Sequence, residues 1–311
     1  MMEVTMEKRV WYTASSNRIG RIYNASIRDE HVDAKGIFII VHGMSEHSDR
    51  YLALSKKLAA KGYIVGLQDL QGHGRSQNLP GNFGPEHGFQ YMLHDLHRLV
   101  LRLMKWYPSL PVIMLGHSMG SFLARSYVLR FPGDLSGLII SGTAGFQYSY
   151  YAVLASLTAD IKMHGDNLCM DKYDEAFMKY MNRAIKEPHH PAAWCTTDDA
   201  LLMARNEDPL SCRLTIGAYR DMLSALINIR PEKWAALVPM IPIYIFSGGA
   251  DPVGNFGAGP AEVYAWLYET GHDVTLRLYP GKRHEMLNET NRNEVEENLF
   301  RWLDDKAFRT L

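Results

Sequence analysis

The sequence predicts an α/β fold in which helices flank a mostly parallel central sheet and a helical cap is inserted into the chain. Short apolar runs that fit buried strands recur and alternate with helical patterns. One stretch of about a hundred residues interrupts this alternation, and it is far longer than an ordinary strand-to-helix loop. In addition, Gly-x-Ser-x-Gly at residues 116–120 stands between a predicted strand and a predicted helix.

The individual elements follow from these patterns in chain order. A hairpin is predicted over residues 10–25, with its turn at Ser15-Ser16-Asn17. The further predicted strands are 37–41, 63–67, 112–115, 137–141, 241–246 and 274–279. The clearest predicted helices are 53–61, 91–107, 122–131 and 260–270. Because most strands are separated by helices, the sheet should be mostly parallel.

The long interruption is predicted to be the cap, over residues 145–232, with the core formed by residues 1–144 and 233–311. The cap begins with the aromatic and apolar sequence FQYSYYAVLASL. Its six methionines are Met163, Met170, Met178, Met181, Met203 and Met222. Helical spacing places most single methionines in the cores of the cap helices. Together, methionines and aromatics predict an adaptable apolar pocket that suits flexible acyl chains.

Ser118 is the candidate nucleophile. A serine on a sharp strand-to-helix turn, called a nucleophile elbow, is held at strained backbone angles, and Gly116 and Gly120 leave room for the chain that packs around it. The hydroxyl then projects above the carboxyl edge of the sheet. The amide of Met119, at the start of the new helix, can face a developing oxyanion.

His284 is the candidate general base among the five histidines that follow Ser118. It follows the predicted strand 274–279 on a Gly-containing loop at the carboxyl edge, where ligand sites of open α/β sheets gather. His272 precedes the same strand and therefore belongs to the opposite edge. The other three, His164, His189 and His190, lie in the cap.

Asp251 is the candidate acid that orients the base. It lies in SGGADPVG, just after the predicted strand 241–246. The other usual position, after the strand that follows the elbow helix, reads GLIISGTAGF and offers no carboxylate. The chain order Ser118, Asp251, His284 is the order expected for a hydrolase with this serine turn.

Met44 is the candidate for a second oxyanion donor, through its backbone amide. The apolar run 37–41 predicts a buried strand, and His42-Gly43 then turns the chain toward the site. His42 itself fits a structural hydrogen-bonding residue beneath this loop better than a proton carrier.

Several sequence blocks together resemble the monoacylglycerol lipase and lysophospholipase group of α/β-hydrolases, and the later blocks resemble its bacterial members. The core blocks are HGMSEH at 42–47 with Arg50-Tyr51, Asp69 with GHGRS at 72–76, and GHSMG at 116–120. The later blocks are Trp194 with Asp198, DPL at 208–210 with Thr215, DPVG at 251–254 and LYPGKRHEMLNE at 278–289. One departure is Ser121, where the group commonly has a second glycine. The resemblance implies a serine esterase that acts on acyl esters without a metal or an organic cofactor.

Two other classes of function remain open on the sequence. An aminopeptidase or a thioesterase would use the same three catalytic residues with a different pocket. An aminopeptidase would need carboxylates to hold a substrate ammonium, and the cap offers Asp198, Asp199, Glu207 and Asp208. A non-catalytic ligand-binding protein on this fold is the second class, although the complete set of catalytic positions argues against it.

The composition of the chain limits the kinds of partner that it is expected to bind. The formal net charge of -1 offers no field suited to a polyanion, so a nucleic-acid partner is not expected. His94 and His97 share a helix face, but no further ligand motif completes a metal site, so we expect a solvated helix face.

The three cysteines fit reduced thiols, and the absence of an apolar leader predicts a cytoplasmic protein. The expected partner is a small, lipid-like acyl ester, with transient contact of the cap with micelles or bilayers. The oligomeric state stays open.

Overall fold

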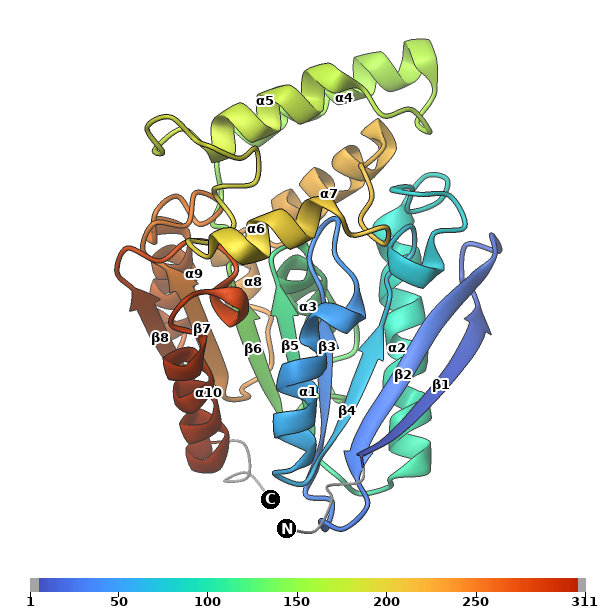
Figure 1. The fold of residues 1–311 in the computed structure, drawn as a ribbon, viewed down its shortest axis with the longest axis vertical. Coiled ribbons are helices and arrows are strands. Elements are labelled where there is room, and N and C mark those ends of the chain that lie inside the picture. The colour runs from blue at the N-terminus through green and yellow to red at the C-terminus, as the bar shows by residue number, and fades with distance from the viewer. Residues whose placement is uncertain (1–5, 307–311) are drawn as a thin grey trace.

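A single eight-stranded sheet organises the chain, with strand order β1-β2-β4-β3-β5-β6-β7-β8. The computed structural model describes residues 6–306 (Figure 1). The strands are β1 (Met6–Ala14), β2 (Arg21–Asp29), β3 (Gly36–Val41), β4 (Tyr63–Gln68), β5 (Val112–His117), β6 (Gly137–Ser141), β7 (Ile243–Gly248) and β8 (Val274–Tyr279). β2 pairs antiparallel with β1 and β4, and all other neighbouring strands are parallel. The predicted mostly parallel sheet is therefore confirmed.

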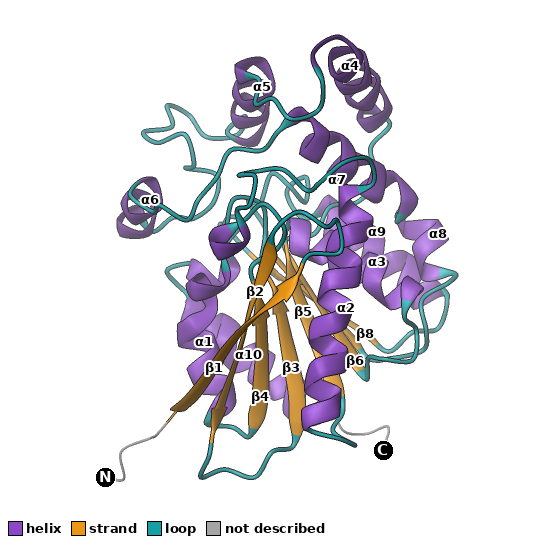
Figure 2. Cartoon of the chain, turned by 90° about the vertical axis from the view of Figure 1, so that its right-hand side faces the viewer, coloured by secondary structure: helices purple, strands orange, loops and turns teal. Residues whose placement is uncertain are grey.

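Helices cover both faces of this sheet (Figure 2). One face carries α1 (Leu52–Ala59) and α10 (Arg292–Lys306). The other face carries α2 (Gly88–Trp106), α3 (Met119–Arg130), α8 (Pro231–Ala235) and α9 (Ala258–Glu269). Because of this double cover, every residue of β3, β4, β5 and β7 is buried. Burial on both faces explains why these strands read as continuous apolar runs in the sequence.

Four helices between β6 and β7 lie beyond the carboxyl ends of the parallel strands (Figures 1 and 2). They are α4 (Ser149–His164), α5 (Asp171–Met181), α6 (Asp199–Asn206) and α7 (Ile216–Asn228). They fall within residues 145–232, the segment predicted as the cap; the division into core and cap at these boundaries stays a prediction. α7 packs against α2, α3 and α4, so it connects the sheet layer with the outer helices.

Some predicted boundaries were wrong, and each error has a local or a tertiary cause. β7 begins at Ile243 rather than at Ile241, after Pro242, which has no N–H to donate to the ladder. α2 begins at Gly88 rather than at Tyr91, since the amide of Gly88 donates to Asp221 Oδ2 on α7 at 2.6 Å. That contact joins residues far apart in the sequence, and a local pattern cannot reveal it.

The prediction that His94 and His97 lie on a solvated helix face holds for His94, whereas His97 is half-buried. Its ring stacks on Phe131 with centroids 3.7 Å apart, and its Nδ1 lies 3.0 Å from the hydroxyl of Tyr127. His94, by contrast, is exposed. His97 therefore joins α2 to the end of α3 as a packing residue.

Within residues 6–306, none of the helices is both long and apolar enough to cross a bilayer. The cytoplasmic location stays a prediction from the sequence.

Candidate active site

Ser118 lies at the sharp turn between β5 and α3, with φ 54° and ψ -123°. A positive φ is costly for a residue with a Cβ, by about 1–3 kcal/mol, and persists only where surrounding contacts enforce it. The amide of Ser118 donates to the carbonyl of Ser141 on β6 at 2.9 Å. Ser121, the departure noted in the sequence, donates from Oγ to the carbonyl of Ser118 at 2.6 Å. The substituted serine therefore supports the turn rather than crowding it.

Glycines allow three backbone segments to meet around this turn. A Cβ on Gly116 would lie 2.3 Å from the carbonyl oxygen of Gly120, and a Cβ on Gly120 would lie 2.2 Å from that of Val41. Real Cβ atoms do not approach backbone oxygens so closely. Gly43, in the loop after β3, is a third case, because its Cβ would lie 3.0 Å from the Cβ of Ser118. Sequence reasoning did not assign that role to Gly43.

His284 and Asp251 form a buried pair on the loops after β8 and β7. His284 Nδ1 lies 2.9 Å from Asp251 Oδ2, and the carboxylate accepts this hydrogen bond. The same oxygen accepts from Ser247 Oγ at 3.0 Å, and Oδ1 accepts from the amide of Val253 at 2.9 Å. Three donors therefore fix the carboxylate, and the carboxylate fixes the imidazole.

The pair shifts both pKa values in opposite directions. Burial by itself raises the pKa of Asp251, but the charge of His284 and its hydrogen bond outweigh burial and leave the pKa below its usual value. Burial by itself lowers the pKa of His284, but the charge of Asp251 and the shared hydrogen bond more than compensate, so that pKa is raised. The arrangement stabilises the state with an ionised carboxylate beside a protonated imidazole.

The loop after β3 brings Met44 to the same place. Met44 contributes to the lining of a cavity that Ser118 and His284 also line. Beneath the loop, His42 Nδ1 lies 2.8 Å from the carbonyl of Gly43, and His42 Nε2 accepts from the amide of Leu70 at 2.9 Å. Burial lowers the pKa of His42, so its ring stays neutral and stabilises the loop through its hydrogen bonds.

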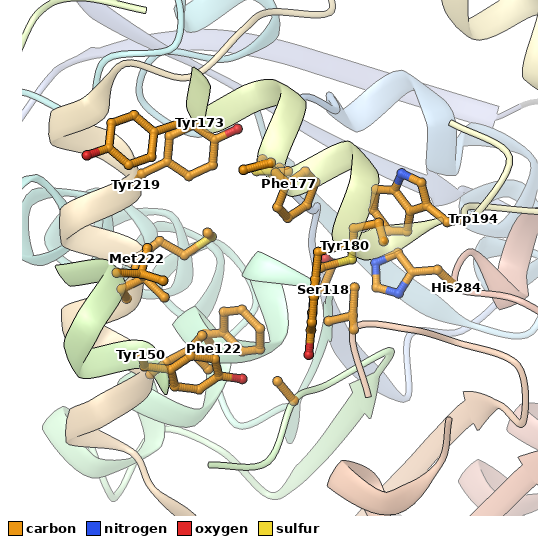
Figure 3. Close-up of a pocket in the computed structure, with 18 of the residues that line it drawn as sticks. Ser118, Phe122, Tyr150, Tyr173, Phe177, Tyr180, Trp194, Tyr219, Met222 and His284 are labelled. Carbon is orange, nitrogen blue, oxygen red and sulfur yellow. The ribbon is translucent and has the colours of Figure 1, made fainter. Parts of the chain in front are cut away.

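The cavity has a volume of about 350 Å³. Figure 3 shows Ser118 and His284 next to each other at one end, with Tyr219 and Met222 at the other. Its walls are largely aromatic and aliphatic side chains, most of which come from the helices between β6 and β7. The aromatic members are Phe122, Tyr150, Tyr173, Phe177, Tyr180, Trp194 and Tyr219. Such a cavity can hold a flexible apolar chain in extended form next to the serine.

Buried charges line the cavity close to the serine, and sequence reasoning missed them as site residues. Glu46 accepts from the amide of Gly43 at 3.0 Å and from the hydroxyl of Tyr51 at 2.8 Å. Glu285 accepts from Arg50 and, at 2.5 Å, from Arg205 on α6. Glu46 and Arg50 belong to the block 42–51, and Glu285 follows His284 directly. Their position in the sequence, close to the predicted catalytic residues, is the feature from which these charged residues could have been predicted.

Comparison with known proteins agrees with this geometry. A model of the family described as serine aminopeptidase, S33, matches residues 32–291. The monoacylglycerol lipase of Mycolicibacterium smegmatis is 28% identical, with 87% of this chain and 89% of that protein covered. A monoglyceride lipase homolog of monkeypox virus is 36% identical, with 88% of this chain and 90% of that protein covered.

A solved structure agrees as well. A highly thermostable carboxyl esterase from Bacillus coagulans, in complex with glycerol, superposes with a TM-score of 0.92 at 32% identity. The match covers 97% of this chain and 100% of that one. The resemblance inferred from the sequence blocks is confirmed. The chain therefore belongs to the serine aminopeptidase S33 family of α/β-hydrolases, and it is a serine hydrolase of carboxylic esters of the monoacylglycerol lipase type.

Proposed function

We propose that Ser118, His284 and Asp251 are the catalytic triad of a lipase that hydrolyses monoacyl esters such as monoacylglycerols. One observation carries this proposal: a serine at a strained turn shares one end of an apolar cavity with a histidine that is hydrogen-bonded to a buried carboxylate. A nucleophile, a base and an orienting acid are thereby placed where an acyl ester would enter.

The reaction is two-step acyl transfer. His284 accepts the proton of Ser118 as the serine oxygen attacks the ester carbonyl, and Asp251 stabilises the resulting imidazolium. His284 then donates that proton to the leaving alcohol, and the acyl group remains on Ser118. Water enters, gives a proton to His284 and attacks the acyl-enzyme; the bond between the acyl group and Ser118 then breaks, His284 returns the proton to the serine oxygen, and the acid is released. No step requires a metal or an organic cofactor.

The amides of Met44 and Met119 are the proposed oxyanion donors. Met119 is the first residue of α3, so its amide has no partner inside the helix. Met44 comes from the loop that Gly43 brings against Ser118. Two backbone donors from different segments would stabilise the charge that develops on the carbonyl oxygen.

The cavity supports a lipid-like substrate. Its apolar walls fit an acyl chain, and the polar side chains of Glu46, Arg205 and Glu285 belong to the same lining. The relatives named as monoacylglycerol or monoglyceride lipases point to the same class. A glycerol monoester combines one long chain with a small polar head, and it therefore matches both parts.

An aminopeptidase is the second candidate, because the matching family carries that description. Such an enzyme needs a carboxylate that is free to bind a substrate ammonium. Asp198 caps α6, Asp199 is exposed beside His189, and Asp208 pairs with His47. Among the described residues that line the cavity, the two carboxylates are Glu46 and Glu285, and both are already hydrogen-bonded to neighbouring groups. The geometry therefore favours an ester substrate.

Contact with a lipid surface is part of the proposal. α4 and α5 lie at the end of the molecule opposite the two termini (Figure 1), and exposed apolar side chains occur on and beside them. These side chains are Tyr148, Tyr151, Val153, Met163 and Tyr180. Val153 and Tyr180 also line the cavity, so this surface adjoins the route that an acyl chain would take. Transient adsorption to micelles or bilayers would present lipid substrate to it.

The test is hydrolysis of p-nitrophenyl esters of increasing chain length, beside 1-monoacylglycerol, lysophosphatidylcholine, an acyl thioester and an amino-acid p-nitroanilide. The purified wild-type protein is compared with Ser118→Ala. We expect hydrolysis of monoacylglycerol and its complete loss in Ser118→Ala, and a fluorophosphonate probe should label only the wild type.

Each other outcome has a definite meaning. Turnover of the anilide in preference to every ester would replace the lipase with an aminopeptidase, and preference for the thioester would replace it with a thioesterase. A folded wild type that neither turns over any of these substrates nor reacts with the probe would show a non-catalytic binder.

A further inference from the structure

The imidazole of His284 packs against two aromatic rings that come from different parts of the chain. His117 lies at the end of β5. The centroid of its ring is 4.7 Å from that of the His284 ring, and the two ring planes are at 44°. The centroid of the Trp194 indole is 5.0 Å from that of the His284 ring, and these two ring planes are at 40°. Trp194 precedes His284 by ninety positions and belongs to the segment between α5 and α6. Figure 3 shows its indole directly beside the imidazole.

The chain around Trp194 is also hydrogen-bonded to the chain around His284. Arg283 Nη1 donates to the carbonyl of Ala193 at 2.6 Å and to that of Thr196 at 3.1 Å. The amide of Glu285 donates to the carbonyl of Cys195 at 2.7 Å. Both neighbours of His284 in the sequence are therefore attached to residues 193–196.

The attachment continues along the same two segments. Thr196 Oγ1 donates to the carbonyl of Asn288 at 3.1 Å. Thr197 donates to the carboxylate of Glu289, from its amide at 3.0 Å and from Oγ1 at 2.6 Å. Residues 193–197, which the sequence assigns to the cap, thus lie along residues 283–289 as a continuous support. This segment is bound to the loop that carries the histidine.

We propose that Trp194 is a positioning residue that holds the imidazole of His284 in its reactive orientation, with residues 193–197 fixing Trp194 against it. The inference rests on the proposed role of His284 as the general base. The bond from Nδ1 to Asp251 is a single hinge about which the ring can pivot. The contacts with the rings of Trp194 and His117 oppose that motion and so keep Nε2 available to Ser118. A loss of alignment of about 1 Å typically costs on the order of a hundredfold in rate.

Trp194 also acts on the charge of His284. An indole face stabilises an adjacent cation, so it favours the imidazolium that forms during attack. The charged and titratable groups that face His284 are Asp251, Glu285, Glu46 and His117. Burial lowers the pKa of His117 to about 4, so at neutral pH this neighbour carries no charge that would oppose the imidazolium. Trp194 therefore acts together with the two glutamates and Asp251.

The experiment measures kcat, KM and the pH profile of p-nitrophenyl butyrate hydrolysis for Trp194→Leu and Trp194→Phe. Trp194 Nε1 makes no hydrogen bond to the described residues, so Trp194→Phe keeps an aromatic face and removes no such bond. For Trp194→Leu we expect kcat to fall about 10- to 100-fold with KM within about twofold. We also expect the pKa read from kcat/KM to fall by about 0.5. Trp194→Phe should recover kcat to within about threefold of the wild type.

Phe177→Leu is the matched control. Phe177 lines the same cavity and packs edge-on against Trp194 with centroids 5.7 Å apart, whereas among residues 6–306 the rings packed against His284 are those of Trp194 and His117. We expect this variant to raise KM and to leave the pH profile in place. If Trp194→Leu behaves in the same way, with kcat and the pH profile unchanged, Trp194 is only a wall of the cavity and the inference is overturned.

Arg283→Met covers the case in which Trp194→Leu does not fold, as judged by circular dichroism. This variant removes the two bonds to Ala193 and Thr196 and keeps the indole. It should lower kcat at constant KM, and an unchanged kcat would contradict the inference. The proposed function fails independently, through an inactive wild type or an active Ser118→Ala.

Discussion

Arg125 and Trp234 make two contacts with each other, a cation–π contact and a hydrogen bond. The guanidinium carbon of Arg125 lies 4.8 Å from the centroid of the Trp234 ring, and Trp234 Nε1 donates to the carbonyl of Arg125 at 2.8 Å. From the same buried position, Arg125 donates to the carbonyl of Ala144 at 3.0 Å and to that of Ile229 at 2.5 Å. Ala144 and Ile229 lie near the two ends of the segment 145–232. One arginine on α3, the helix that directly follows Ser118, therefore connects both ends.

Arg125→Met is expected to lower the free energy of unfolding by about 3 kcal/mol. It leaves two carbonyls without their donor in a buried environment, and this outweighs the lower desolvation cost of methionine. Burial lowers the pKa of Arg125 to about 9, so the native side chain is protonated at neutral pH. Urea denaturation provides the measurement, with Arg130→Met, at the exposed end of the same helix, as the control. A decrease in the free energy of unfolding below about 1 kcal/mol would show that Arg125 does not stabilise the protein by connecting these segments.

Gly120→Ala is expected to destabilise the protein by about 2 kcal/mol or more and to abolish ester hydrolysis. The new Cβ would lie 2.2 Å from the carbonyl oxygen of Val41 and 2.5 Å from that of His42. Backbone of β3 and its loop cannot move away without displacing Met44. Gly133→Ala is the control, since nothing lies within 4 Å of its Cβ, and its effect should stay within about 0.5 kcal/mol. Equal stability of the two variants would contradict the close packing of the elbow.

The pH profile of kcat/KM should have an acidic limb governed by His284. Above its pKa the imidazole is neutral and accepts the proton of Ser118, whereas below that pKa it is protonated and inactive as a base. Because Asp251 raises the pKa of His284, the limb should have its midpoint above the ordinary value of about 6.5.

Asp251→Asn should move this acidic limb to lower pH and reduce kcat by roughly a thousandfold or more. The variant removes the charge that favours the imidazolium and the acceptor that fixes the ring. Asp305→Asn, on the exposed side of α10, serves as the control and should leave the profile unchanged. A limb that stays in place in Asp251→Asn would assign the titration to another group.

Met222→Trp should shorten the acyl pocket and shift substrate preference toward short chains. Met222 lies on α7 at the end of the cavity away from Ser118, so a larger side chain there fills space that only a long chain reaches (Figure 3). We expect activity on p-nitrophenyl laurate to fall about tenfold or more relative to the butyrate. Met163→Trp makes the same change at an exposed position and should keep the wild-type preference. Parallel losses on both esters would mean that the chain does not extend toward α7.

Local sequence was sufficient for features that depend on neighbouring residues. The buried strands were predictable because double cover by helices requires continuous apolar runs, and β8 was predicted with its observed bounds. The placement of Ser118 at a strand-to-helix turn followed from its two glycines, since only Gly fits where backbone oxygens come within 2.3 Å. Asp251 and His284 could be predicted as candidate site residues because parallel strands bring their carboxyl ends to one edge of the sheet.

Only the tertiary structure could decide contacts between distant residues. The start of α2 depends on Asp221, and the carbonyls that Arg125 binds, Ala144 and Ile229, lie 19 and 104 positions away. The contact of Trp194 with His284 depends on how residues 193–197 lie along residues 283–289. The sequence by itself thus determined the strands, the elbow and the candidate triad, because short-range sterics and strand order specify them. The shape of the pocket and the groups that support His284 were decided by long-range packing, which no local pattern encodes.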